Sequence, residues 1–141
     1  MDKSHFDEYI RRFNERDRTA FDDYLAPDMH MTNGTLEFDG VTGMRAHYEK
    51  IWVSFDEELH VERYVSDSDT VAIQMWTHFT AHRDDPESLF GKVEKGTTFD
   101  FHGLIMYRLR ADGLFQDIKV AYNSFTRTDP DGSSVELGVP H

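Results

Sequence analysis

The chain has 141 residues, 38% of them hydrophobic and 13% aromatic, which is enough for one globular domain with a substantial core. Its 15 basic and 27 acidic residues give a formal net charge of -12, which opposes binding to nucleic acid and to anionic membrane surfaces. Cysteine is absent, so disulfides, thiolate catalysis and thiolate metal sites are excluded. The sequence shows neither a signal peptide nor a run of roughly 18 apolar residues, so we expect a cytoplasmic protein that does not span a membrane.

The first part of the chain predicts three helices and a short hairpin. Apolar residues recur at helical spacing over residues 4–15, and again after Asp17 until Pro27 ends the second helix. Residues 29–38 predict a hairpin around an Asn-Gly turn. A third helix begins near Thr42, and its predicted buried side consists of Met44, Tyr48, Ile51, Trp52 and Phe55.

The rest of the chain predicts an antiparallel sheet. Two strands are expected over residues 59–65 and 71–82, and a polar, mobile loop over residues 83–96. Residues 97–126 then predict a long hairpin whose turn is Arg110-Ala111-Asp112-Gly113. Both faces of its first strand are apolar or aromatic, which favours a strongly curved sheet that encloses something. We expect one domain over residues 1–128 and a flexible tail over residues 129–141.

This order of elements predicts an α+β fold, in which three helices cover one face of a curved, mixed or antiparallel sheet. Several short motifs resemble the SnoaL-like branch of the nuclear transport factor 2-like superfamily. The motifs are Phe13-Asn14-Glu15-Arg16-Asp17, Tyr24-Leu25-Ala26-Pro27-Asp28-Met29, Gly40 with Tyr48, and Phe101-His102-Gly103 through Tyr107-Arg108 to Asp112-Gly113. The resemblance implies a cone with a closed apolar end and a ligand pocket, and a homodimer formed through the outer sheet face.

The resemblance to ketosteroid isomerase, an enzyme of this superfamily, carries over only in part. The oxyanion-hole tyrosine of that enzyme falls on Tyr9, its general-base aspartate on Asn33 and its protonated aspartate on Ile105. An amide cannot accept a proton at neutral pH and isoleucine cannot donate a hydrogen bond, so this constellation disfavours steroid-type enolisation. The acid/base aspartate of the polyketide cyclases has its nearest match at Asn123.

Strand alternation, anchored by the resemblance, predicts which side chains face the pocket. For the strand over residues 71–82 we expect Gln74, Trp76, His78 and Thr80 to face inward. For the long hairpin we expect Phe99, Phe101, Gly103, Ile105, Tyr107, Ile118, Val120 and Tyr122. The opposite parity would instead bring in Asp100, His102, Asp117, Lys119 and Asn123. The first choice is favoured because its hairpin residues are more apolar.

Among these residues His78, Tyr9 and Asn33 are the candidate catalytic groups. His78 could act as a general base in a dry pocket, or it could be a core histidine with a structural hydrogen bond. Asn33 and Tyr9 could orient a substrate oxygen. The expected substrate contacts are Gln74, Trp76, Trp52, Tyr48, Phe101, Ile105, Tyr107 and Tyr122, although aromatic residues at such spacing also serve as core. The histidines show no metal-binding spacing, so no metal is expected.

These observations predict a small hydrophobic, cyclic and oxygenated molecule as the partner. The leading hypothesis is a cofactor-independent isomerase, cyclase or dehydratase that transfers protons in an apolar pocket, although it lacks the aspartates usual in such enzymes. The alternative is a ligand-binding or dimerisation domain of the same fold without catalysis. The missing carboxylates favour this alternative.

Overall fold

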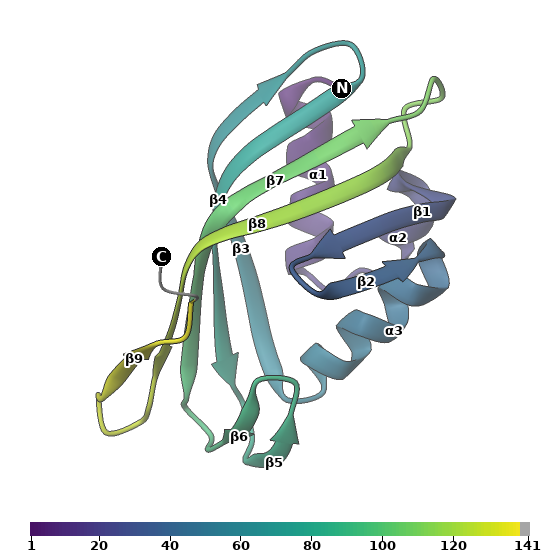
Figure 1. Cartoon of the computed structure of the whole chain (residues 1–141). Helices are drawn as coiled ribbons and strands as arrows, with labels where there is room; N and C mark the ends of the chain where they lie inside the picture. The colour runs from purple at the N-terminus through teal and green to yellow at the C-terminus, as the bar shows by residue number, and fades with distance from the viewer. Residues whose placement is uncertain (139–141) are drawn as a thin grey trace.

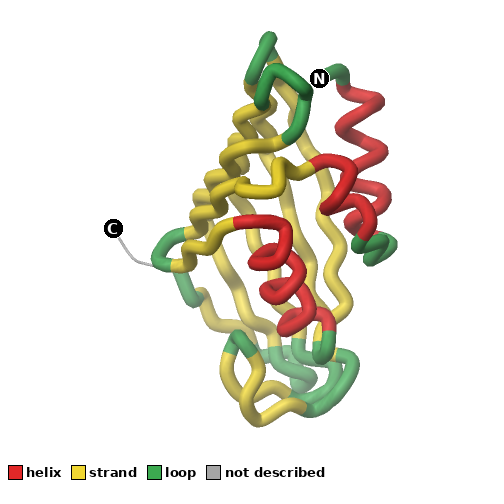
Figure 2. The backbone as a smooth tube through the Cα atoms, turned by 90° about the vertical axis from the view of Figure 1, so that its right-hand side faces the viewer, coloured by secondary structure: helices red, strands yellow, loops and turns green. Residues whose placement is uncertain are grey.

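The computed structural model describes residues 1–138 and has three helices on one face of a strongly curved sheet (Figures 1 and 2). The helices are α1 (Lys3–Asn14), α2 (Thr19–Tyr24) and α3 (Gly40–Trp52). The strands are β1 (Leu25–Asn33), β2 (Leu36–Asp39), β3 (Phe55–Ser66), β4 (Thr70–Ala81), β5 (Asp85–Ser88), β6 (Gly91–Val93), β7 (Thr98–Leu109), β8 (Phe115–Thr128) and β9 (Ser134–Glu136). The predicted α+β cone with three helices is confirmed.

The main sheet is mixed. Its strands follow the order β2-β1-β8-β7-β4-β3, and β9 pairs with β8 outside this path. The β1 and β8 strands are parallel, whereas the other pairings in the sheet are antiparallel. This order places the predicted long hairpin, β7 and β8, at the centre of the sheet.

Several boundaries differ from the predicted ones. The second helix ends at Tyr24, and Pro27 lies within β1 instead of at the end of a helix. The β3 strand begins at Phe55, which the sequence had assigned to the buried side of the third helix. The predicted loop over residues 83–96 contains a small hairpin of β5 and β6, because Gly91 takes a positive φ of 89° at the turn.

The sheet bends where β7 and β8 come closest. The register shifts between His102 and Gly103, so that Asn123 of β8 is an extra residue between the partners Tyr122 and Ser124. A Cβ atom on Gly103 would lie 2.3 Å from the backbone oxygen of Ala121. Only glycine fits there, and the bulge lets β7 and β8 curve around the helices (Figure 1).

An asparagine side chain attaches the first helix to the exposed edge of the sheet. The Asn14 amide donates from Nδ2 to the backbone oxygen of Leu59 at 2.9 Å and accepts at Oδ1 from the Leu59 N–H at 2.8 Å. These two bonds satisfy backbone groups of β3, which is the terminal strand of the sheet. The end of α1 is thereby fixed beside the first half of β3.

Aromatic side chains fill one end of the cone. The Phe6 ring lies 5.3 Å from the Tyr107 ring, and the Tyr107 ring lies 4.8 Å from the Phe115 ring, measured between centroids. Phe6 and Phe115 are fully buried, and Tyr107 is 3% exposed. The closed apolar end that the resemblance implied is therefore present.

The end of the described chain folds back on β8. The Glu136 carboxylate of β9 accepts hydrogen bonds from the Phe125 N–H at 2.7 Å and from Thr126 Oγ1 at 2.9 Å. The predicted flexibility of residues 129–141 stays a prediction, and residues 139–141 lie outside the described part. Within residues 1–138, no helix is long and apolar enough to cross a membrane. The cytoplasmic location also stays a prediction.

Candidate functional site

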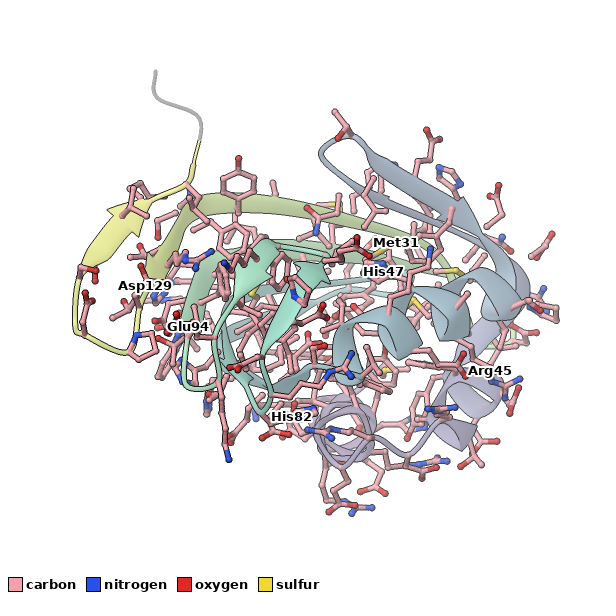
Figure 3. The ribbon with its side chains drawn as sticks, turned by 90° about the horizontal axis from the view of Figure 1, so that it is seen from below. Met31, Arg45, His47, His82, Glu94 and Asp129 are labelled. Atoms are coloured by element: carbon pink, nitrogen blue, oxygen red, sulfur yellow. The ribbon has the colours of Figure 1, made fainter. Side chains whose placement is uncertain are left out.

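A cavity of about 220 Å³ lies between the helices and the inner face of the sheet. Most of its lining is apolar or aromatic, including residues from α1, α3, β1, β4, β7 and β8. Met31 of β1 and His47 of α3, both labelled in Figure 3, line it. Its polar lining groups are Tyr9, Asn33, His47, Tyr48, Glu57, Thr77, Tyr107 and Tyr122. This combination of an apolar wall and a few polar groups is typical of a small-molecule site.

Glu57 is the one carboxylate in the described lining of this cavity. It lies on β3 between Phe55 and Leu59, and all three side chains point inward because alternate residues of a strand share a face. Glu57 is only 8% exposed, and its Oε1 accepts a hydrogen bond of 3.1 Å from Trp52 Nε1. Burial raises the pKa of Glu57 to about 8, and the Trp52 bond and the charge of Arg16 oppose this rise only in part. Glu57 therefore holds a proton near neutral pH.

The groups around Glu57 are also uncharged near neutral pH. Burial raises the pKa of the Tyr9 and Tyr48 phenols, and the negative charge of Glu57 raises them further. Burial also raises the pKa of Tyr107, while it lowers the pKa of His47 to about 4. The tyrosines thus remain hydrogen-bond donors and His47 remains a neutral imidazole. The cavity offers several proton donors and acceptors without a fixed charge.

Many of the predicted site residues do line this cavity. Tyr9, Asn33 and Tyr48 face it from α1, β1 and α3. The hairpin residues Phe101, Ile105, Tyr107, Ile118, Val120 and Tyr122 face it as the chosen parity predicted. Trp52 is absent from the described lining and contacts Glu57 instead, which corrects its predicted place against the substrate. The chemical roles of the lining residues stay predictions.

The predicted inward face of β4 is wrong. Thr77 pairs with Phe101 and Ile73 with Ile105, so the odd-numbered residues of β4 share the inner face with the hairpin residues. The inner face consists of Val71, Ile73, Met75, Thr77, Phe79 and Ala81, all of which are buried. Gln74, Trp76, His78 and Thr80 therefore lie on the outer face. Opposed residues of paired strands share a face, so in the observed register the parity predicted for β4 is incompatible with the parity predicted for the hairpin.

On the outer face His78 belongs to a small hydrogen-bonded cluster. Its Nδ1 lies 2.6 Å from Asp100 Oδ1, and the same oxygen accepts a bond of 2.8 Å from Trp76 Nε1. The Trp76 ring is stacked between His60, at 4.7 Å, and His102, at 5.9 Å between centroids. His78 is therefore neither a general base in the cavity nor a core histidine.

Glu57 is not among the site residues predicted from the sequence. The pattern Phe55-x-Glu57-x-Leu59 is a two-residue alternation with a carboxylate at an apolar position, which is a strong signal for a buried functional acid. The signal was lost because residue 55 was assigned to a helix and the strand was begun at residue 59. His47 was also missed, since a lone histidine on a helix carries no distinctive pattern.

Within residues 1–138, no group of three or more histidine, cysteine, aspartate or glutamate side chains is arranged to hold a metal ion. The acid of the cavity therefore has no neighbouring set of ligands with which to share a cation.

The raised pKa of Glu57 predicts a pH dependence of stability. The ordinary glutamate value is 4.5 and the folded value is about 8, so the folded protein binds this proton more tightly than the unfolded chain does. The contribution of this proton to the free energy of unfolding is fully present below the ordinary glutamate pKa of 4.5, and it is lost as the pH rises through about 8. The Glu57→Gln variant stays neutral at every pH, so it should gain a few kcal/mol relative to wild type over this interval. Denaturant unfolding at a series of pH values measures the difference.

A matched control is Glu58→Gln on the same strand. The Glu58 side chain is 64% exposed, so this variant should keep the wild-type pH profile. Identical profiles for wild type and Glu57→Gln would contradict the raised pKa.

Comparison with known proteins agrees with the fold. Residues 6–118 match the SnoaL-like domain, and no curated protein matches the chain significantly. A solved candidate polyketide cyclase from Xanthomonas campestris pv. campestris is 23% identical, with a TM-score of 0.69 over 82% of this chain and 84% of that one. The epoxide hydrolase/cyclase-like enzyme SalBIII, described with a role in pyran ring formation, is 16% identical, with a TM-score of 0.68 over 86% and 89% of the chains.

A computationally designed 17-OHP binder is also similar. It is 17% identical, with a TM-score of 0.65 over 82% of this chain and 87% of the binder. At such low identities a structural likeness shows the fold and no activity. The match to the family covers most of the chain, from the first helix into β8. The chain belongs to the SnoaL-like domain family of the nuclear transport factor 2-like superfamily.

Proposed function

We propose that this protein transfers a proton to or from a small, hydrophobic, uncharged, oxygen-containing molecule, as an isomerase, cyclase or dehydratase that needs no cofactor. One observation carries the proposal, namely the buried Glu57 carboxyl in the wall of an apolar cavity. A carboxyl group that is protonated near neutral pH can act as a general acid, and its carboxylate can then act as a base. The pKa of about 8 suits both steps at the pH of most cells.

Other cavity groups suit the positioning of a substrate. Trp52 holds one oxygen of Glu57, so the other oxygen is free to meet a ligand. The Tyr9 and Tyr48 hydroxyls can donate hydrogen bonds to a substrate oxygen, and the Asn33 amide can donate or accept. The apolar wall excludes water from the reacting group. In this arrangement Glu57 supplies, from a different strand, the acid/base group that Asn33 and Ile105 cannot supply.

The fold neighbours agree with a small-molecule site. They include a candidate polyketide cyclase and an epoxide hydrolase/cyclase-like enzyme, both with about the same overall fold. The alternative function is ligand binding without catalysis. It is favoured by the absence of carboxylates at Asn33 and Ile105, and by the similarity to a computationally designed 17-OHP binder.

Turnover of a substrate panel tests catalysis. Neutral cyclic alcohols, epoxides and ketones are incubated with the protein in deuterated water, and products and deuterium incorporation are followed by mass spectrometry. We expect turnover of at least one compound class, with a loss of roughly a hundredfold or more in Glu57→Gln because general acid/base catalysis is removed. Trp52→Phe should lose less, and Glu58→Gln should keep the wild-type rate. Turnover that survives in Glu57→Gln would contradict the role of Glu57, and binding of panel members without any turnover would favour the alternative.

We also propose that two copies associate through the outer face of the sheet. Leu104 and Met106 of β7 are 52% and 54% exposed there, opposite Gln74 and Ala72 of β4, and exposed apolar side chains of this kind suit an interface. Sedimentation equilibrium should give a dimer for the wild type and a monomer for Met106→Asp. The control Val135→Asp changes an equally exposed residue on β9 and should stay dimeric. A wild-type monomer would contradict the proposal.

A further inference from the structure

The cavity has an acid but no lysine or arginine in its described lining. Among the described lining residues, Glu57 is the one that can hold a negative charge, and none is lysine or arginine. The basic group whose charge acts on the pKa of Glu57 is Arg16, and its guanidinium is already paired with Asp56 at the surface. Oε1 is held by Trp52, and Oε2 makes no hydrogen bond within residues 1–138. The free oxygen of a buried carboxylate therefore has no counter-charge of its own.

Aromatic rings line the same cavity as this acid. Tyr9, Phe13, Tyr48, Phe101 and Tyr107 all line the same cavity. The Phe13 and Tyr48 rings are 5.0 Å apart and nearly perpendicular, while Tyr9 and Tyr107 are 6.5 Å apart. The faces of aromatic rings carry negative partial charge and attract cations, most strongly where water is excluded.

The net charge of the whole chain also favours a cationic ligand over an anionic one. Its formal net charge of -12 lowers the potential energy of a cation near the protein and raises that of an anion. An anionic intermediate in the cavity would meet the net negative charge of the protein without a lysine or arginine in the described lining to balance it. A cationic species would meet a carboxylate and ring faces.

We propose that the cavity recognises positive charge, so that it binds hydrophobic ammonium ions in preference to neutral or anionic molecules of the same shape, with Glu57 as the counter-ion. This inference deepens the proposed function and rests on the same cavity. It names the substrates as hydrophobic alcohols or epoxides whose C–O bond breaks to leave a positively charged carbon. A bound ammonium ion mimics that carbon.

The proposed reaction of an alcohol balances as a dehydration. The Glu57 carboxyl gives its proton to the hydroxyl oxygen, the C–O bond breaks with its electron pair on oxygen, and water leaves. The positive carbon then faces the Glu57 carboxylate and the aromatic rings. The carboxylate removes a proton from the neighbouring carbon, the C–H electron pair forms the double bond, and Glu57 regains its proton.

The affinity of the cavity for an ammonium ion should depend on pH. An ammonium ion binds the carboxylate form of Glu57, so its affinity should rise with pH until the carboxyl has lost its proton. Burial raises the pKa of the Tyr9 phenol of α1 and of the Tyr48 phenol of α3, so both stay protonated over this pH range, and the Arg16 guanidinium is paired with Asp56. The His47 imidazole is already neutral above a pH of about 4. Glu57 is the group that should set the pH dependence between about pH 6 and 9.

The experiment uses two sets of molecules matched in shape. Each set has an ammonium ion, an alcohol and a carboxylate on one framework, cyclohexyl in the first and adamantyl in the second. Calorimetry measures binding at about pH 6 and about pH 9 for wild type, Glu57→Gln and the control Glu58→Gln. At the higher pH we expect the ammonium ion to bind at least about tenfold more tightly than the alcohol, with no binding of the carboxylate.

The preference for the ammonium ion over the alcohol should be smaller at the lower pH and absent in Glu57→Gln. The Glu58→Gln variant should keep this preference. Equal binding of ammonium ion and alcohol, a preference that survives in Glu57→Gln, or no binding of either ammonium ion would overturn the inference. Ammonium binding that depends on Glu57 in a protein without turnover would keep this inference and reject the proposed catalysis. Turnover that depends on Glu57, together with tighter binding of neutral molecules than of ammonium ions, would support the proposed catalysis and reject this inference.

Discussion

The close approach of β7 and β8 at Gly103 determines the shape of the molecule. A side chain at this position would overlap the backbone of β8, and the extra residue Asn123 bends the pair around it. The bend turns a long hairpin into the wall of a cone, and the helices close the cone from the other face. A flat sheet with the same residues would pack its aromatic side chains into a continuous core, leaving no cavity for a ligand.

The second constraint is the burial of Glu57 inside that cone. A carboxylate in an apolar cavity is costly, so the group takes up a proton at neutral pH instead. The Asn14 amide fixes the edge strand beside it, and Trp52 holds one of its oxygens. A group that lowers stability at high pH and is held in place by two neighbouring elements is better explained by function than by folding.

The sequence predicts the fold better than the site, for physical reasons. Helical spacing, turn residues and the apolar hairpin face each constrain one local element, and together they define the α+β cone. The inward face of β4 is harder to predict from the sequence, because both of its faces have side chains that suit burial. Trp76 and His78 lie on one face, and Ile73 and Met75 lie on the other. Only the register with β7 decides between them, and register is a property of two strands. Glu57 was missed for a related reason, since its place depends on where β3 begins.

The raised pKa of Glu57 is the central claim, because the acid/base chemistry uses the carboxyl that is protonated near neutral pH and the recognition of positive charge uses the carboxylate that forms as the pH rises. An NMR titration of the side-chain carboxyl carbons measures it directly, with the Glu57 resonance assigned by its absence in Glu57→Gln. This account predicts a midpoint near 8, well separated from the exposed glutamates. A midpoint near the ordinary value of 4.5 would contradict it.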